Sequence, residues 1–469
     1  MDYEKVLKLI YPEPGQSIFT DTQLKQIYEL IKYYDYYENN VFKYIEAEYP
    51  EYRKTNERSP AQIPINYSQY IVDKLAEWQF EKPIDISVTT ENKADDKKAD
   101  EVEKDLYKLH KKNKMDLKLL QAAKECNISG GVAIKMIYDP ELKMVRFLPR
   151  PRIECFPVTE FDDYEKINKV HFVAFKSEDI VWKQTFEMKD GKCLFSEATY
   201  NVKNNLELEE WIQKPTFLGS GNKYIDFMPV YIIPNTPGVG MIWGYSELAN
   251  LIPIINELNK KYSDASDALR FEMFAITIIM NMKDFSTTGR PKTKPGAVWR
   301  LMSAGTGDAK TDIKKLESSF AYRETLNNHI ESLKNTMFEL SSVIQINPET
   351  VSKLGSMSGV ALKLMYASMI SKTNIKNVVW KPILEQMYYE SLKMRGVYEA
   401  YTFPDVNVEI INHLPIPLNE KEEVEIATMK LAAGLSSTRA AMDSLGIQDP
   451  EAMMAEILEE ENSREESYK

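Results

Sequence analysis

The spacing of the hydrophobic residues changes along this chain. Over roughly the first 85 residues, aliphatic residues and tyrosines recur at helical spacing, most clearly in residues 21–49. We interpret these tyrosines as a packing face of the predicted helices. Residues 89–127 begin as a charged surface connection and become an amphipathic helix.

Between Gly130 and about Tyr231 the hydrophobic period shifts towards two, which is typical of strands. The sequence predicts turns at "DPELK" and "KDGK". The strands that it predicts are "GVAIKMIYD", "KVHFVAFK", "KQTFEM" and "PVYIIP". We therefore expect an α+β protein that is mostly helical.

After Pro234 the hydrophobic residues step by alternating threes and fours, in two seams of period near 3.5. Such seams are typical of helices packed lengthwise. Gly244 or Ser246 can open the first helix, and Pro253 either kinks it or marks where its regular part begins. A long helical hairpin and an ordinary bundle with an inserted hairpin both fit. The seams consist of Leu248, Leu251, Ile255, Leu258, Tyr262, Ala265 and Leu269, and of Leu326, Ile330, Leu333, Met337, Leu340 and Ile344.

An excursion of residues 272–318 separates the two seams. It begins with a β-branched strand at 274–280 and continues into a basic loop, so we predict a small α/β module at the tip of the helical pair. The basic residues of this loop are Arg290, Lys292, Lys294 and Arg300.

A loop and a long helix follow the second seam. Residues 347–359 are rich in serine and glycine, and the helical pattern then resumes and runs to a glycine stop at Gly396. This helix would be roughly 50 Å long, more than a core of ordinary size needs, so it predicts a radial spoke or an intersubunit strut. Pro382 removes one backbone donor and crowds the carbonyl of Val378, so we expect a kink there.

Composition narrows the class of protein. The chain has 469 residues, of which 43% are hydrophobic, so it can bury a large core. A net charge of −12 argues against binding nucleic acid over its whole surface. Cys126, Cys155 and Cys193 are too few and too scattered for a disulfide framework or a zinc site. Neither export nor membrane insertion is favoured, since the N-terminus lacks a signal-peptide core and no apolar run reaches bilayer length.

Two short motifs imitate those of nucleotide-binding enzymes. "VAIK" (Val132–Lys135) matches the lysine strand of protein kinases, but the catalytic loop, the magnesium ligand and the glycine-rich loop are missing. "GTGDAKT" (Gly305–Thr311) is no phosphate-binding loop, because the chain has no G-x-x-x-x-G-K-[ST]. The four histidines are dispersed. We therefore expect no enzyme activity, no catalytic residue, no metal site and no cofactor.

Four segments, in the right order, resemble the portal (connector) proteins of tailed bacteriophages of the long-tailed siphophage type. They flank a predicted helix–insert–helix–loop–kinked-helix core, and the resemblance covers most of the chain. The segments are "PINYSQYIVDKLAEWQFEKPIDIS" (Pro64–Ser87), "NTPGVGMIWGYSELANLIPIINELNKKYSD" (Asn235–Asp264), "SGVALKL" (Ser358–Leu364) and "VEIINHLPIPLNEKEEVEIATMKLAAGLSSTRAAMDSLG" (Val408–Gly446).

The resemblance implies a homo-oligomeric ring, usually of twelve subunits, at one vertex of the virion capsid. Double-stranded DNA would enter and leave through its channel without tight binding. The implied partners are the terminase packaging motor, the head-tail adaptor, and capsid and scaffolding proteins, with assembly in the host cytoplasm and no membrane. The implied parts are a wing (1–244, the helix 360–396 and a strand after 397), a stem (245–271 and 319–346), a clip (272–318), a tunnel loop (347–359) and a C-terminal crown within 397–469.

The resemblance also implies roles for single residues. In the tunnel loop, Gly355 and Gly359 would permit sharp backbone geometry, and the serines would leave a small polar surface. The loop candidates are Asn347, Ser352, Lys353, Leu354, Gly355, Ser356, Met357, Ser358 and Gly359. The clip candidates for binding a partner are Arg290, Lys292, Lys294 and Arg300, and the candidates for facing the channel from the stem are Glu257, Asp264 and Asp267.

Other functions fit parts of this pattern. A head-tail adaptor or another ring-forming virion protein would share the ring symmetry, although adaptors are typically shorter. An uncharacterised enzyme would need an acid–base pair in a pocket, and a monomeric helical hairpin would favour a general interaction module. The tyrosine-rich N-terminal helices have no residue-by-residue counterpart in the portal family. The basic face of the helix 360–396 is either matched by acidic neighbours or solvated.

Overall fold

The chain forms two compact units. Unit 1 comprises Met1, Lys74–Tyr245 and Ser342–Lys469, and unit 2 comprises Asp2–Asp73 and Ser246–Ser341. The N-terminal residues belong to the same unit as the predicted stem helices, and the limits of the wing, stem, clip and crown stay a prediction. The computed structural model describes residues 7, 17–55, 59–160, 162–201, 203, 207–273, 277–280, 312–315, 323–345, 359–415, 420–435, 438, 441–442, 445, 453–454 and 456–457.

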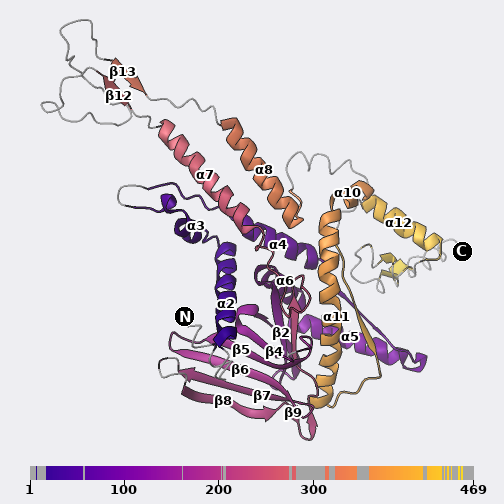
Figure 1. Cartoon of the computed structure of the whole chain (residues 1–469). Helices are drawn as coiled ribbons and strands as arrows, with labels where there is room; N and C mark the ends of the chain where they lie inside the picture. Colours follow the sequence, from indigo (N-terminus) through magenta and orange to yellow (C-terminus); the bar gives the residue numbers. More distant parts are fainter. Residues whose placement is uncertain are drawn as a thin grey trace, which may run out of the picture. The chain divides into compact units, whose positions relative to one another are not determined.

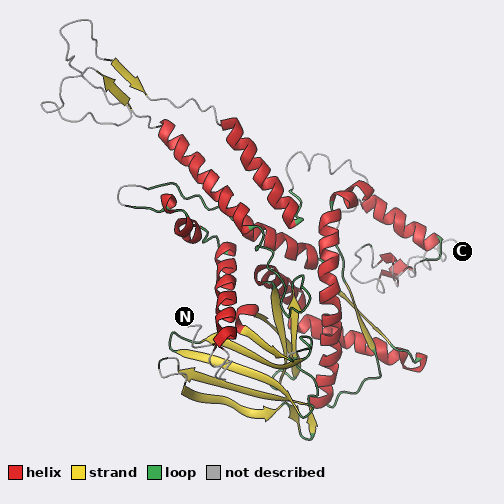
Figure 2. Ribbon diagram, in the orientation of Figure 1, coloured by secondary structure: helices red, strands yellow, loops and turns green. Residues whose placement is uncertain are grey.

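Unit 1 contains two larger antiparallel sheets, drawn as yellow arrows in Figure 2. A three-stranded sheet has the order β11-β2-β3, and a five-stranded sheet has the order β4-β5-β6-β7-β8. Their strands are β2 (Gly131–Asp139), β3 (Met144–Pro151), β4 (Cys155–Thr159), β5 (Ile167–Phe175), β6 (Ile180–Lys189), β7 (Lys192–Asn201), β8 (Glu207–Phe217) and β11 (Val230–Pro234). The predicted α+β class and four of the predicted strands are confirmed.

Local turn chemistry sets the register of the larger sheet. The predicted turn "KDGK" joins β6 to β7, with φ of 53° at Asp190 and 69° at Gly191. Two successive residues with positive φ form the tight hairpin turn whose twist matches that of the flanking strands, and Asp-Gly adopts it readily. The edge strand β8 was not predicted. It is acidic and almost wholly exposed, so it lacks the apolar alternation of a strand that packs on a core.

The core of unit 1 lies between the three-stranded sheet and its helices. The middle strand β2 buries Val132, Ala133, Ile134 and Met136 in succession, as a strand covered on both faces requires. The helices of this unit are α5 (Asp96–Asn113), α6 (Met115–Ser129), α10 (Gly359–Met365), α11 (Ala367–Tyr398) and α12 (Glu420–Ala432). Helix α11 packs beside β2, β3, β11 and β14 (Figure 1).

Short elements complete unit 1. Strand β1 (Asp85–Thr89) pairs with β14 (Asn407–Ile411), which joins the start of the unit to the segment that follows α11. The remaining elements are the 3-10 turns η2 (Lys93–Asp95) and η3 (Arg152–Glu154) and the strands β9 (Gly219–Ser220) and β10 (Lys223–Tyr224).

The long helix departs from its prediction. The helix is interrupted at Tyr366, between α10 and α11. Helix α11 then continues through Gly396 and ends at Tyr398. No break occurs at Pro382, which is an interior residue of α11. Both Pro382 and Val378 are exposed, so water can bind the carbonyl that the proline leaves without a donor. A kink angle at Pro382 stays a prediction.

Unit 2 consists of the N-terminal helices and the predicted stem. Its helices are α2 (Ser17–Tyr37), α3 (Phe42–Glu48), η1 (Pro50–Tyr52), α7 (Ile252–Met273) and α8 (Arg323–Ser341), and α4 (Tyr67–Phe80) crosses the division between the units. Figure 1 draws α7 and α8 side by side, and the two helices pack together. The predicted strand between them forms β12 (Thr277–Met280), which pairs with β13 (Asp312–Lys315).

The stem helices are shorter than predicted. Helix α7 begins at Ile252, so Pro253 marks the start of its regular part and produces no kink. Ser246 instead opens a turn, because its hydroxyl accepts a hydrogen bond from the Leu248 N–H at 3.1 Å. Helix α8 ends at Ser341, and Ser342 has a φ of 60° that no helix can continue.

Candidate functional site

The first predicted seam is buried at its start and exposed at its end, whereas the second is buried at two positions and half-buried or exposed at the others. Leu248, Leu251, Ile255 and Leu258 of the first seam are buried, whereas Leu269 near the end of α7 is 55% exposed. In the second seam, Ile330 and Met337 are buried and Leu340 is 54% exposed. Leu269 and Leu340 are the exposed residues of the two seams.

A segment of the N-terminal region lies along α7. We call residues 59–65 the strap. Three backbone N–H groups of the strap, at alternate residues, donate to three side chains of α7 that are spaced four residues apart. The bonds run from Ala61 to Asp267 Oδ2 (2.9 Å), from Ile63 to Ser263 Oγ (3.1 Å) and from Ile65 to Asn259 Oδ1 (2.7 Å).

The match between strap and helix follows from backbone geometry. Four residues of an α-helix rise about 6 Å, and two residues of an extended chain span about 6.6 Å. Alternate strap residues therefore meet every fourth residue of α7. Pro64 falls between two donors and Pro60 directly precedes the first, and neither proline has an N–H to satisfy. A signal for this contact was present in the sequence, as polar residues at 256, 259, 263 and 267 follow one stripe of the helix.

The tyrosines of the N-terminal region bind the same helix. The hydroxyl of Tyr36 donates to Asn256 Oδ1 at 2.7 Å, and that of Tyr52 donates to Asp264 Oδ1 at 2.8 Å. Burial raises the pKa of Tyr36 to about 12, so this hydroxyl remains a neutral donor at physiological pH. Tyr36 is fully buried, as the predicted packing face requires.

The three carboxylates expected to face the channel all have partners within unit 2. Glu257 forms ion pairs with Lys260 at 2.7 Å and with Lys261 at 3.3 Å. Burial alone would raise the pKa of Glu257, but hydrogen bonds to these lysines and their positive charge outweigh it and lower the pKa. Asp264 and Asp267 accept hydrogen bonds from Tyr52 and from the strap. Their exposure to a channel stays a prediction.

A tight backbone junction in unit 1 ends just before the stem begins. The N–H groups of Asn235 and Gly244 both donate to the carbonyl of Gly130, at 3.0 and 2.8 Å. A Cβ on Gly244 would lie 1.7 Å from the Asn235 carbonyl oxygen, so only glycine fits there. The Asn235 amide also donates to the Tyr245 carbonyl at 2.8 Å. The junction therefore fixes the path of the chain as it leaves the sheet.

A buried lysine of α11 reaches this junction. Lys376 is 4% exposed, and its Nζ donates to Asn235 Oδ1 at 2.8 Å and to Asn127 Oδ1 of α6. A buried ammonium group needs such acceptors, because leaving it without hydrogen bonds would cost several kcal/mol, of order 3–5. The lysine ties α11 to α6 and to the junction. The basic face predicted for this helix is therefore partly internal.

The lysine of the kinase-like motif is also structural. Lys135 lies on β2 and donates to Gln184 Oε1 at 2.7 Å, and its Nζ lies 5.4 Å from the centre of the Phe172 ring. Burial lowers the pKa of Lys135 to about 8. The motif therefore belongs to the packing between the two larger sheets.

Several predicted site residues lie outside the described residues. They are the clip cations Arg290, Lys292, Lys294 and Arg300 and the tunnel-loop residues Asn347, Ser352, Lys353, Leu354, Gly355, Ser356, Met357 and Ser358. Gly359 is the first residue of α10. Among the residues that the structure describes, no cluster of histidine, cysteine and acidic side chains is arranged to hold a metal ion. No described helix has the length and apolarity that crossing a bilayer requires.

Comparison with known proteins finds one matching family and several solved structures of similar fold. The family model described as "Phage portal protein, SPP1 Gp6-like" matches residues 16–467. A chain from the virion of a native gene transfer agent particle has a TM-score of 0.43 and 11% identity, with 81% of this chain and 89% of that chain covered. A chain from the neck of the native particle, computed with C12 symmetry, has a TM-score of 0.43, 12% identity and the same coverage.

A comparison with curated proteins finds no match. The family match spans both units, including the strap, the stem helices, the junction and α11. The chain therefore belongs to the phage portal protein family of the SPP1 Gp6-like type, a family of structural, non-enzymatic virion components at the portal vertex.

Proposed function

We propose that copies of this chain form a closed ring around a channel at one capsid vertex, through which DNA enters during packaging and leaves during ejection. The observation that carries this proposal is the family match over residues 16–467. Exposed apolar side chains on α7, α8 and α11 support it, because neighbouring subunits would cover them. Head-to-tail contacts generate such a ring when their rotation closes.

We further propose that the ring docks the packaging terminase and, once packaging ends, the head-tail adaptor. The chain contains no P-loop motif, so the energy for moving DNA must come from a partner. The basic residues of the proposed clip, Arg290, Lys292 and Lys294 with Arg300, would bind an acidic surface of these partners.

The channel is proposed to guide DNA without gripping it. Each phosphate that a lysine or arginine neutralises adds affinity, so a strongly basic wall would hold DNA against movement. The proposed stem wall instead pairs its charges, as Glu257 does with Lys260 and Lys261. The tunnel loop, residues 347–359, would make the closest approach to DNA with small side chains.

Electron microscopy of the purified protein tests the ring. We expect closed rings with a central channel at micromolar concentration, and a light-scattering mass many times that of one chain. A species near 54 kDa at every salt concentration would contradict the proposal.

Salt-dependent DNA binding tests the guiding channel. We expect weak binding of duplex DNA by the ring, lost well below about 200 mM salt, since few phosphates are neutralised. Tight binding that survives this salt concentration would refute a channel that lets DNA slide.

A further inference from the structure

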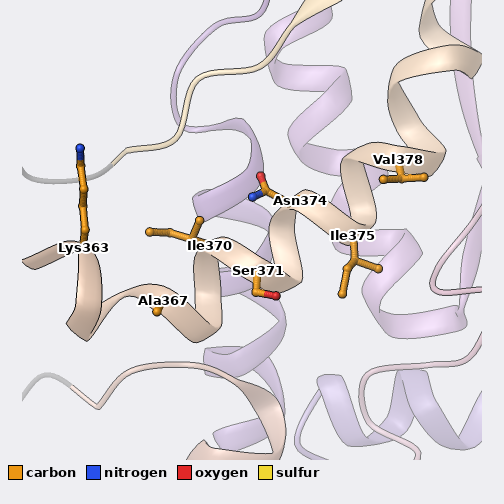
Figure 3. A pocket seen from close by; sticks show the side chains of 7 residues that line it. All are labelled: Lys363, Ala367, Ile370, Ser371, Asn374, Ile375 and Val378. Carbon is orange, nitrogen blue, oxygen red and sulfur yellow. The ribbon is translucent and has the colours of Figure 1, made fainter.

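Helices α10 and α11 carry an apolar stripe that stays exposed among the described residues of unit 1. An open groove of about 470 Å³ follows this stripe. Ile375 is 53% exposed and Val378 is 74% exposed. Figure 3 shows the lining side chains along α10 and the first turns of α11. They are Lys363, Ala367, Ile370, Ser371, Asn374, Ile375 and Val378.

The stripe is additional to the face that anchors the helix. On the other side of α10 and α11, Leu362, Tyr366 and Met369 are buried in a cluster with Trp78, and the Trp78 and Tyr366 rings stack at 4.9 Å. Apolar residues therefore occur on both faces of this region. A helix that is apolar on both faces is normally buried on both, and the second face here stays exposed among the residues that the structure describes.

Helix α12 is a second element whose apolar side chains are exposed among the described residues. Among its described side chains, at 424–432, Ala427 is the single buried one. Ile426 is 45% exposed and Met429 is 66% exposed. At 3.6 residues per turn these two side chains point roughly away from Ala427, whose face packs on the chain itself. The Ile426–Met429 face is therefore the open one.

The two surfaces match in length and charge. The stripe from Lys363 to Val378 is about 22 Å long, and the 13 residues of α12 span about 20 Å. Residues 359–378 include no acidic residue, and Lys363 lines the groove, whereas the buried Lys376 faces the interior of unit 1. The sequence of α12 has four glutamates against two lysines, a net charge of −2. Ala367 and Ser371, one turn apart, leave room for a second helix to approach closely.

We propose that the Ile426–Met429 face of α12 packs into the α10–α11 groove of the next copy of this chain. The inference rests on the proposed ring. A ring with head-to-tail contacts needs two different surfaces on each subunit that fit each other, and these two helices supply them. The contact would place the C-terminal helix of one subunit against the long helix of its neighbour, close in sequence to the neighbour's tunnel loop.

Cysteine cross-linking tests this contact in the full-length protein. Cys126, Cys155 and Cys193 are all buried, so the native chain should give no background when treated with a short bismaleimide. The double variant Ile375→Cys, Met429→Cys should give a ladder of covalent oligomers up to the closed ring. Each single variant should give none, and an assembled mixture of the two single variants should give dimers only.

The outcomes separate the inference from the ring proposal. Intact rings of the double variant in electron microscopy, with no product between subunits, would overturn the inference and leave the ring standing. A linked monomer would also overturn it, since the contact would then lie within one chain. Absence of rings in the native protein would refute both proposals.

Charge insertion gives an independent readout. Val378→Asp and Met429→Asp should each prevent ring formation while far-ultraviolet circular dichroism stays native, because both side chains are exposed in the single chain. Thr428→Asp is the matched control on α12, as Thr428 is exposed away from the Ile426–Met429 face. Rings of normal yield in both Asp variants would overturn the contact.

Discussion

At the scale of single residues, three buried charged groups of unit 1 have partners of matching chemistry. Lys376 binds two amide oxygens, Lys135 binds a third, and Glu390 accepts a hydrogen bond from Tyr231 at 2.6 Å. Burial raises the pKa of Glu390, with Tyr231 and Gln386 opposing that rise through hydrogen bonds. Such pairs fix how the elements meet, since a misplaced helix would leave a buried polar group without its partner.

His171 should make unit 1 sensitive to acid. Burial, aided by the positive charges of Lys183 and Lys169, lowers the pKa of His171 from 6.5 to about 3, and its Nδ1 lies 2.9 Å from Thr185 Oγ1. The unfolded chain therefore binds more protons than the folded chain between pH 3 and 6.5. The free energy of unfolding should have its full value above pH 6.5 and should fall as the pH drops from 6.5 to 3.

Urea titrations of the native protein and of His171→Gln, at several pH values, measure this effect. In the variant, the free energy of unfolding should depend less steeply on pH between 3 and 6.5. At pH 7 the variant should be destabilised by about 1 kcal/mol. His329→Gln, whose side chain is exposed on α8, is the matched control. An unchanged slope in His171→Gln would show that other groups cause the acid sensitivity.

At the scale of elements, polar side chains position helix α7 as much as its apolar seam does. Asn259 and Ser263 are both buried, and both accept hydrogen bonds from the strap. Each also donates back to its own helix, Asn259 to the Ile255 carbonyl at 2.9 Å and Ser263 to the Asn259 carbonyl at 2.7 Å. The strap is therefore held by side chains that are themselves fixed.

Asn259→Leu should release the strap. The substitution leaves the Ile65 N–H without its acceptor, which should cost about 1–3 kcal/mol. Hydrogen exchange of residues 59–65 should accelerate about tenfold or more, since each 1.4 kcal/mol corresponds to a factor of ten. Asn335→Leu on the exposed face of α8 serves as the control. Unchanged exchange in residues 59–65 would mean that the strap is held mainly by other contacts.

The tunnel loop should tolerate little added bulk. Valine at position 355 or 359 would stiffen the backbone or displace the proposed loop, because a β-branched side chain restricts the conformations that glycine allows. We expect Gly355→Val and Gly359→Val to reduce the DNA content of filled heads, with rings of normal yield. Ser356→Ala, which adds no bulk, is the control. Heads filled normally in both valine variants would exclude this role for the loop.

The sequence predicted regular elements well where local chemistry decides them. Examples are β2, with apolar residues on either side of Lys135, and the Asp190-Gly191 turn. The helix limits were less accurate, because Tyr366 and Ser342 interrupt helices without a glycine or proline to mark the place. The strap could not be predicted, since it joins residues about 200 positions apart, although the polar stripe on α7 was visible.

At the scale of the whole molecule, the charge of the proposed clip differs from that of the rest of the chain. The chain carries a net charge of −12, yet the clip segment 290–300 has four basic residues and no acidic one. A basic patch on an acidic protein speeds the encounter with an acidic partner more than it adds to final affinity. The clip is therefore the place where reversed charges should affect docking and leave assembly intact.

Replacing Arg290, Lys292 and Lys294 together by glutamate tests the clip. Rings should form normally, and packaging in vitro by the terminase should fall about tenfold or more, most strongly at low salt. The triple alanine variant should have an intermediate effect, because it removes attraction without adding repulsion. Normal packaging by the glutamate variant would place the docking surface elsewhere.

The strap and α7 repeat their contacts at slightly different distances along the chain. Each step of the strap exceeds the matching step of the helix by about 0.6 Å, so the offset reaches about 1.8 Å after three steps. Short side chains cannot absorb that offset, and the next contact does use a longer one: Arg270 Nη1 donates to the Ser59 carbonyl at 3.4 Å. Arg270 lies three residues after Asp267, so the four-residue spacing ends there, and the difference in repeat limits how many strap residues the short side chains of α7 can bind in register.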